Sequence, residues 1–232
     1  RLVPKNSVFV LIGDIDRAKA NELINRTFEN WKAGDSNPNR ENVSFANING
    51  IRFRLIDNPE LEQATIAMGF KGIPANHQER HALNLVNYLF GGHFSSRLNK
   101  AIRVESGKTY GIGSRWESFR DFGVLGLRTS TRSEEVRNTY NLIISEMQKL
   151  VDSGITEDEL IRAKSYITGS YPLRFESPSV YSNQVASSDY FGFTIDDRQN
   201  VLVDWNAVTL DEVNEVARKY YSPENFILVI VG

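Results

Sequence analysis

Short apolar stretches, several of them alternating with polar residues at a period of two, predict β-strands. The clearest is PENFILVIVG, where an apolar run lies between a proline-led turn and a closing glycine. The predicted strands cover residues 8–12, 51–56, 63–70, 109–114, 122–131 and 226–231. We expect residues 122–131 to pair antiparallel with residues 109–114, and the sequence DNPELE to join the strands 51–56 and 63–70.

Apolar residues that recur every three or four positions predict amphipathic helices between these strands. The expected helices cover residues 17–31, 77–90, a short segment after Ser95 or Ser96, and residues 136–153, 157–171, 179–191 and 210–220. Candidate N-terminal caps are Asp16, Asn76, Thr156 with Glu159, and Thr209 with Glu212. The pattern indicates an α+β fold, with a mainly antiparallel sheet and helices packed largely on one face.

Composition divides the chain into two parts. Residues 33–48 are rich in Gly, Asn, Asp, Ser and Pro, which is typical of a surface linker. Residues 1–32 then form a first strand-helix unit or the end of a preceding homologous half, and residues 49–232 form the main domain.

The two predicted terminal strands resemble each other. PKNSVFVLIG at residues 4–13 and PENFILVIVG at residues 223–232 share a proline, an asparagine two residues later, an apolar run and a closing glycine. Such self-similarity indicates the end of one domain copy followed by a second copy, although two buried strands can also look alike by chance. Because the first residue is Arg and not Met, we expect a fragment or a processed chain, and the repeated motif predicts that a related half lies upstream.

Composition also excludes several classes of function. The chain has 232 residues, 41% of them hydrophobic, and no apolar run approaches the roughly 20 residues of a membrane span. A net charge of −2 does not indicate nucleic-acid or anionic-membrane binding. The absence of Cys excludes disulfides and thiolate metal sites, and it leaves the redox compartment undecided.

A histidine pair in the sequence HQERH comes close to a zinc-binding pattern. An inverted zincin needs His-x-x-Glu-His, in which the glutamate directly precedes the second histidine. Here His77 and His81 have the right spacing, but Glu79 is one position early and Arg80 takes its place. We expect the pair to lie on the solvated first turn of a helix and to bind no catalytic zinc. The alternative is a zinc site that lacks the usual glutamate. His93 has no matching partner in the sequence, so we expect it to be a surface residue and not a metal ligand.

Gly107 separates a short helix from a strand and brings an arginine and a tyrosine together. Leu98 and Ile102 form the apolar side of the helix, which leaves Arg103 near its C-terminal end, where a cation is favourable. Tyr110 is expected to open the strand beside that end. From the residues alone, the expected interpretation is that Arg103 is a surface cation at a helix end and Tyr110 is a packed strand aromatic.

The sequence LFGGHFSSRLNKAIRVESGKTYGIGS, residues 89–114, resembles the insulinase-like zinc peptidases, also called the pitrilysin or M16 family. Bacterial M16 peptidases and the subunits of mitochondrial processing peptidase belong to this family. Its pattern is a Gly-rich turn, Phe-Ser-Ser-Arg-Leu, then Leu-Arg-Glu, a short spacer and Gly-Leu-Ala-Tyr. The chain keeps Gly91, Gly92, Phe94, Ser95, Ser96, Arg97, Leu98, Arg103, Gly107 and Tyr110, and it departs at Ile102, Val104, Lys108 and Thr109.

The resemblance implies the C-terminal, non-catalytic half of such a peptidase, with an insulinase-type α+β fold. In the family, the arginine and tyrosine that match Arg103 and Tyr110 reach a zinc site across an internal chamber. These two residues are therefore the expected substrate-binding residues, and we expect no catalytic residue and no metal in this chain alone.

Zinc is expected in a homologous His-x-x-Glu-His half, either upstream in the same polypeptide or in the partner subunit of a homo- or heterodimer, acting on a peptide substrate. A structural assembly module without catalysis, or a peptide-binding protein without a partner enzyme, are the alternatives. Bacterial relatives of this size are often exported, so the expected compartment is the periplasm.

Overall fold

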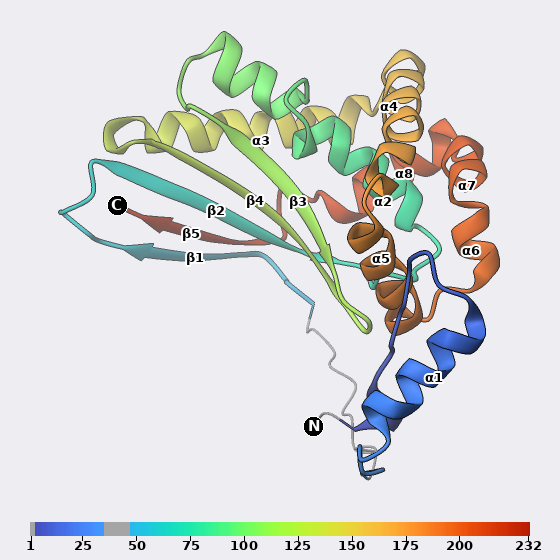
Figure 1. The fold of residues 1–232 in the computed structure, drawn as a ribbon. Helices are drawn as coiled ribbons and strands as arrows, with labels where there is room; N and C mark the ends of the chain where they lie inside the picture. Colours follow the sequence, from blue (N-terminus) through green and yellow to red (C-terminus); the bar gives the residue numbers. More distant parts are fainter. Residues whose placement is uncertain (1–2, 35–46) are drawn as a thin grey trace.

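The computed structural model describes residues 3–34 and 47–232, and its strands form one sheet in the order β1-β5-β2-β4-β3 (Figure 1). The strands are β1 (Ile51–Ile56), β2 (Gln63–Gly72), β3 (Ile112–Ser118), β4 (Gly123–Arg132) and β5 (Phe226–Val231). All neighbouring strands are antiparallel except β1 and β5, which run parallel. The predicted α+β class with a mainly antiparallel sheet is confirmed.

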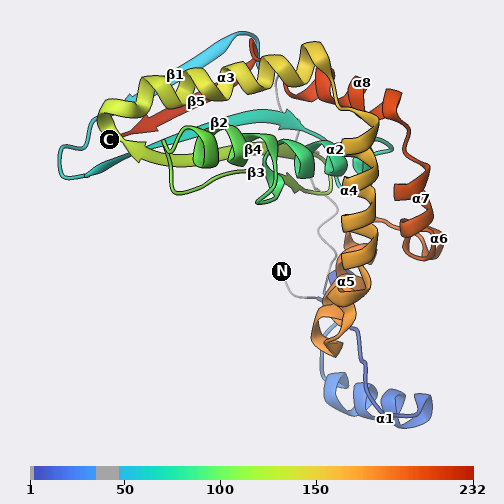
Figure 2. The ribbon, with the colours of Figure 1, turned by 90° about the horizontal axis from the view of Figure 1, so that it is seen from above.

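Three helices cover one side of this sheet: α2 (Arg80–Asn87), α3 (Val136–Ser153) and α8 (Leu210–Tyr220) (Figures 1 and 2). The remaining α-helices are α1 (Arg17–Phe28), α4 (Glu157–Ser170), α5 (Pro178–Phe191), α6 (Ile195–Gln199) and α7 (Val201–Ala207). Two π-helical segments, η2 (Tyr88–Gly92) and η3 (Asn99–Glu105), follow α2, and short 3₁₀ turns cover Pro4–Asn6, Ser133–Glu135 and Pro172–Phe175. In the part of the chain that the structure describes, no helix has the length and apolar character required to cross a bilayer.

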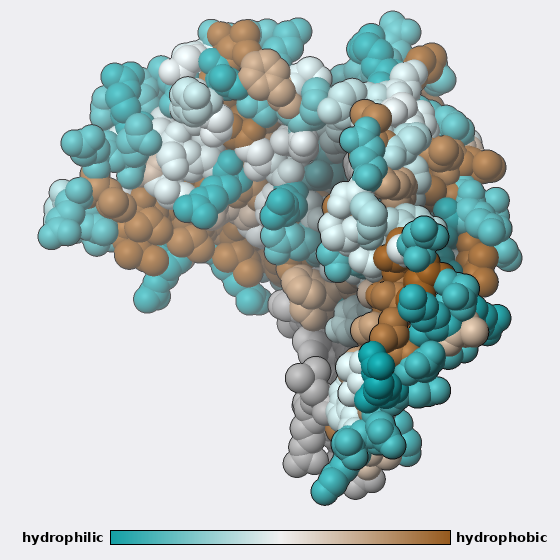
Figure 3. Space-filling model, in the orientation of Figure 1, coloured by the Kyte–Doolittle hydropathy of each residue, from teal (hydrophilic) through white to brown (hydrophobic). Residues whose placement is uncertain are grey.

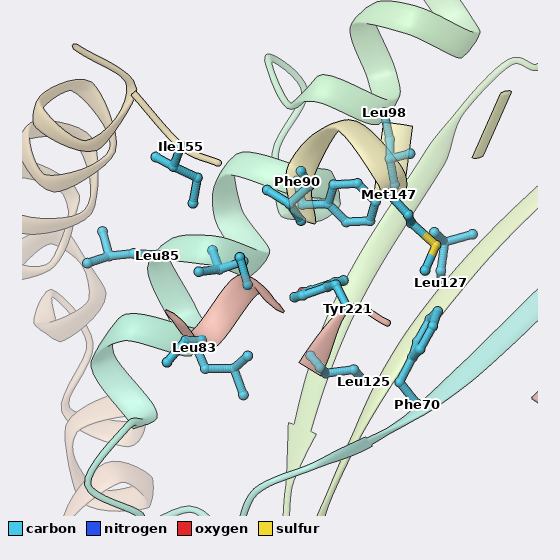
Figure 4. Close-up of a cluster of buried hydrophobic side chains, with 14 of the residues drawn as sticks. Phe70, Leu83, Leu85, Phe90, Leu98, Leu125, Leu127, Met147, Ile155 and Tyr221 are labelled. Atoms are coloured by element: carbon cyan, nitrogen blue, oxygen red, sulfur yellow. The ribbon is translucent and has the colours of Figure 1, made fainter. Parts of the chain in front are cut away.

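The core lies between the sheet and these helices because every second residue of a strand points to the same side. In β2 this alternation buries Ala64, Ile66, Met68 and Phe70. Figure 4 shows Phe70 and Leu125 of the sheet close to Tyr221, and the rings of Phe70 and Tyr221 lie 6.2 Å apart. Each fully buried apolar side chain of this kind contributes roughly 1.5–3 kcal/mol.

Helix ends follow the predicted capping chemistry in most places. Asp16 accepts a hydrogen bond from the Lys19 N–H at 2.8 Å, and Thr156 and Thr209 form the two predicted capping boxes. A third box, Thr194 with Asp197, starts α6, which the sequence pattern did not predict. The Thr-x-x-acid spacing of Thr194 and Asp197 is present in the sequence, and it is the signal that could have predicted the start of α6.

Two elements of the central segment begin later than predicted. Asn76 does not cap a helix, because residues 76–79 form turns in which the Arg80 N–H donates to the His77 carbonyl at 3.1 Å, and α2 begins at Arg80. Tyr110 likewise precedes its strand, which begins at Ile112.

The predicted strand at residues 8–12 is wrong. Val8, Phe9, Leu11 and Ile12 are 38% to 57% exposed, and within residues 3–34 and 47–232 no strand pairs with them. A strand needs a neighbour for its backbone hydrogen bonds, so an apolar run without one stays irregular. The prediction for residues 33–48 falls largely on residues 35–46, which lie outside the described residues.

The strand β1 has the predicted bounds and β2 runs two residues further than predicted, to Gly72, but the two are not neighbours in the sheet. β5 lies between them, so the DNPELE connection crosses over one strand. As a result β1 is an edge strand, and all six of its residues are exposed. Figure 3 shows apolar side chains gathered along the region of β1.

Gly91 and Gly92 belong to η2, and neither has the positive φ of a helix-terminating glycine. Their role is close packing. A Cβ on Gly91 would lie 2.6 Å from Ser114 Oγ in β3 and 2.9 Å from Leu98 Cδ1, while a Cβ on Gly92 would lie 2.8 Å from the Asn87 amide nitrogen. Gly91 therefore lets η2 lie directly against β3, and Gly92 avoids a clash with Asn87 at the end of α2.

We predict that Gly91→Ala lowers the free energy of unfolding by about 1–3 kcal/mol, because the added methyl must displace Ser114 or Leu98. Urea unfolding of the purified chain measures this loss. Gly69→Ala is the matched control, since a Cβ at Gly69 meets nothing within 4 Å. Equal stability of Gly91→Ala and wild type would contradict the packing role.

Candidate functional site

The structure places Arg103 and Tyr110 side by side on the surface. The guanidinium carbon of Arg103 lies 4.6 Å from the ring centre of Phe94 and 5.4 Å from that of Tyr110. Tyr110 is 92% exposed and Phe94 is 63% exposed, so both rings face solvent. Phe94 belongs to the family pattern, but sequence reasoning gave it no role. Its ring holds the guanidinium by a cation–π contact.

A tight connection determines the spacing of the two residues. Ile102 is fully buried, and its carbonyl accepts hydrogen bonds from the Ser106 hydroxyl at 2.7 Å and from the Lys108 N–H at 3.0 Å. Gly107, with a φ of 61°, supplies the left-handed turn between them. The break predicted at Gly107 is therefore confirmed, and it directs the chain from η3 into β3.

The buried Asn99 side chain ties this unit together. Its amide nitrogen lies within hydrogen-bond distance of the Ile112 carbonyl at 2.6 Å, the His93 carbonyl at 3.2 Å and the Ser96 hydroxyl at 3.2 Å. The Asn99 N–H also donates to Ser96 Oγ at 3.5 Å, although η3 itself begins at Asn99 with Leu98 at its N-cap position and no side-chain cap. One side chain thus joins the loop before η3 to the first residue of β3.

Arg97 anchors the same loop to α4. Its guanidinium donates to both carboxylate oxygens of Glu159, at 2.9 and 2.6 Å, and to the Gly154 carbonyl at 2.7 Å. Burial alone would raise the pKa of Glu159, but these hydrogen bonds and those from Thr156 lower it to about 2. The Glu159 carboxylate therefore takes part both in the capping box of α4 and in the ion pair with Arg97.

The histidine pair does not form a zinc site. Glu79 accepts hydrogen bonds from Lys219, at 2.7 and 2.9 Å, and from the Tyr220 hydroxyl. Its N–H donates to His77 Nδ1 at 3.1 Å. Within the described ranges there is no group of three or more His, Cys, Asp or Glu residues that could hold a metal ion. The Glu79 carboxylate and His77 Nδ1 are thus engaged by other partners, and these residues do not fit zinc.

His81 lies inside the protein and not on a solvated turn as we predicted from the sequence. Its side chain is 12% exposed, with Nε2 3.6 Å from Asp204 Oδ2, and its ring meets the edge of Trp205 at 5.7 Å. Burial, together with the neighbouring Arg80 cation, lowers the pKa of His81 to about 4. Arg80, which takes the sequence position of the zincin glutamate, is itself paired with Asp197 at 2.9 Å.

We predict that Arg97→Ala lowers the free energy of unfolding by about 2–3 kcal/mol, because Glu159 loses its partner in a partly buried position. Urea unfolding is the measurement, and Arg97→Lys should recover only part of the loss because an ammonium cannot make the same paired contact. Arg162→Ala, an exposed arginine of the same helix region, is the control. A stability of Arg97→Ala within experimental error of that control contradicts the anchor.

We also predict that stability falls as the pH drops from about 6.5 to about 4, by on the order of 2–3 kcal/mol from His81 alone. The folded-state pKa of His81 lies below its usual value, so the unfolded chain binds the extra proton in this window. Urea midpoints at each pH measure the loss. His81→Gln should flatten this part of the profile, and His77→Gln is the matched control that retains it.

Comparison with known proteins matches residues 1–167 to the family described as the peptidase M16 inactive domain. The chain is 28% identical over 220 residues to an uncharacterized zinc protease of Rickettsia felis, a match that covers 94% of this chain and 51% of that protein. It is 29% identical over 179 residues to a protein of Helicobacter pylori named "Non-peptidase homolog YmxG", covering 75% of this chain and 40% of that one. The chain thus spans about half the length of the curated relatives it matches.

Solved structures share the fold. A peptidase M16 inactive domain from Pseudomonas fluorescens superposes with a TM-score of 0.84 at 21% identity, covering 95% of this chain and 52% of that one. A chain of Complex III2 from Candida albicans gives a TM-score of 0.76 at 18% identity, covering 95% and 53%. The family match covers well over half of the chain, and the chain belongs to the peptidase M16 inactive domain family.

Proposed function

We propose that this chain is the non-catalytic half of a zinc metalloendopeptidase. In this proposal it binds peptide substrate and presents Arg103 and Tyr110 to a homologous His-x-x-Glu-His half, which lies upstream in the same polypeptide or in a partner subunit. The metal belongs to that other half and would supply the activated water for hydrolysis. The residues of this chain bind and orient the peptide.

The observation that carries the proposal is the pairing of the half-buried Arg103 guanidinium with the exposed Tyr110 ring. Both groups are hydrogen-bond donors, and peptide hydrolysis places negative charge on the carbonyl oxygen of the cleaved bond. A guanidinium and a phenol hydroxyl can stabilise that oxygen or hold the neighbouring substrate backbone. Tyr110 is open to a peptide and a second half, and Arg103 keeps part of its surface exposed beside it.

The scaffold of the pair supports the proposal further. The Asn99 amide bonds, the Gly107 turn and the Phe94 contact fix the backbone and restrict the guanidinium before substrate arrives. A donor that is already oriented loses less conformational entropy on binding than a free surface side chain. The relatives named zinc proteases are about twice as long as this chain, which leaves room for a further half in them.

We predict that Arg103→Ala and Tyr110→Phe each lower kcat/KM by about a hundredfold when this chain acts together with its zinc-bearing half. Cleavage of a fluorogenic peptide by the complete protein is the measurement. Arg218→Ala and Tyr181→Phe, which change the same residue types far from the pair, are the controls. Arg103→Lys should restore part of the activity because it keeps a cation.

A catalytically inert assembly module is the second candidate, and the Helicobacter pylori relative named a non-peptidase homolog favours it. The two functions predict different results in the same assay. If turnover in Arg103→Ala and Tyr110→Phe matches that of the controls while the complete protein still assembles, the assembly module is the better account. Peptide affinity with no partner enzyme would instead indicate a binding protein.

A further inference from the structure

The position of Tyr110 depends on the backbone around it, because its own ring is almost entirely in solvent. The ring is 92% exposed, and its neighbour Arg103, with the guanidinium carbon 5.4 Å from the ring centre, is a long flexible side chain. The β3–β4 ladder begins with Ile112 opposite Thr129, so residues 108–111 lie before the paired part of β3. Contacts other than the backbone ladder must therefore hold the segment that carries Tyr110.

Two threonine hydroxyls of β4 contact this segment from the core side of the sheet. Thr129 and Thr131 are 3% and 2% exposed, and they alternate with exposed or half-buried residues of β4, so their side chains point toward the helices. Thr129 Oγ1 lies 2.9 Å from the Gly111 carbonyl oxygen and 2.8 Å from Thr109 Oγ1. Thr131 Oγ1 donates to the Lys108 carbonyl at 2.6 Å. Residues 108–111 therefore lie on the helix side of the sheet, where these hydroxyls replace a backbone ladder.

The Thr109 hydroxyl bridges the backbone across Tyr110. It donates to the Ser130 carbonyl of β4 at 2.7 Å and accepts a hydrogen bond from the Gly111 N–H at 3.1 Å. Thr109 and Gly111 are the two chain neighbours of Tyr110. One side chain thus ties the residue after Tyr110 to the residue before it, and both to the adjacent strand.

The helix α3 holds the same segment at its other end. Thr139 of α3 is fully buried, and its hydroxyl donates to Thr131 Oγ1 at 3.3 Å, which continues the chain of hydrogen bonds into the core. Lys108 Nζ lies 2.9 Å from Glu135 Oε1, directly before α3, and the two side chains are 27% and 15% exposed. Such a partly buried ion pair is screened less by salt than a fully exposed one.

Two of these anchoring residues stand where the chain departs from the family pattern. The pattern has Leu and Ala between the glycine and the tyrosine, and here these positions are Lys108 and Thr109. The side chains of Leu and Ala cannot donate or accept a hydrogen bond. The two departures therefore add polar anchors to the segment that carries Tyr110.

We propose that Thr109 and Thr129 are positioning residues for Tyr110, whose hydroxyls hold the backbone that presents the phenol to a bound peptide. The proposal rests on the function proposed above and names the residues that keep its tyrosine in place. A group that is already oriented loses less conformational entropy when substrate binds. Thr109 contributes most, because its hydroxyl is bonded on both sides of the tyrosine.

The test is a double-mutant cycle in the complete protein, with cleavage of a fluorogenic peptide as the readout. Thr109→Val keeps the shape of the side chain and removes its hydroxyl, and we expect kcat/KM to fall by about tenfold. In a Tyr110→Phe background the same change should cost less than about twofold, because the hydroxyl that Thr109 positions is already absent. Thr129→Val should follow the same pattern, and Thr109→Ser, which keeps a hydroxyl, should remain near wild type.

Thr65→Val is the matched control. The Thr65 hydroxyl lies 3.2 Å from Ser130 Oγ on the opposite side of the sheet, so this variant removes a threonine hydroxyl beside the same strand without touching residues 108–111. It should leave kcat/KM within about twofold of wild type. Amide hydrogen exchange of the purified chain adds a readout without turnover. The Gly111 N–H should exchange about fivefold faster in Thr109→Val, and at the wild-type rate in Thr65→Val.

Three results would overturn the positioning role: wild-type kcat/KM in Thr109→Val, an equal loss from Thr109→Val in the Tyr110→Phe background, or unchanged exchange at Gly111. The cycle also separates this role from the proposed function. If Tyr110→Phe loses turnover and Thr109→Val does not, the positioning role alone is wrong. If Tyr110→Phe keeps full turnover, the proposed function and the positioning role are both wrong.

Discussion

The relative position of Arg103 and Tyr110 depends on one buried amide, the side chain of Asn99. It joins the loop before η3 to the carbonyl of Ile112, the first residue of β3. Because the group is buried, its hydrogen bonds do not compete with water, and an unsatisfied amide there would be costly. Buried hydrogen bonds of Asn99 thus fix the backbone that carries Arg103 and Tyr110.

Two neighbouring devices make this arrangement possible. The glycine pair of η2 allows a helical segment to approach β3 more closely than any side chain would permit. Arg97 fastens the other side of the loop to the start of α4 through Glu159. The family pattern Gly-Gly, Phe-Ser-Ser-Arg-Leu therefore serves mostly as scaffold in this protein, and its exposed Phe94 ring contacts Arg103.

Local chemistry was predictable from the sequence, and long-range partnership was not. Thr156 with Glu159, Thr209 with Glu212 and the Gly107 break depend on neighbours a few residues away, and each was found where the pattern put it. The strand predicted at residues 8–12 failed because a strand is defined by its partner and not by its own residues. The burial of His81 depends on Trp205 and Asp204, far along the chain, and the pairing of Arg97 with Glu159 likewise has no signal in local spacing. The site residues Arg103 and Tyr110 came from a family resemblance, and the structure adds that they touch.

The edge strand β1 has a consequence for the handling of this chain in solution. Its outer backbone groups have no neighbour among the described strands, and its apolar side chains are exposed, while the extended apolar residues 8–12 lie unpaired in the same molecule. An open edge and a free apolar segment are complementary templates for intermolecular strand pairing. At high concentration, self-association of this kind is the main colloidal risk, and dilute samples are the appropriate form in which to study the isolated chain.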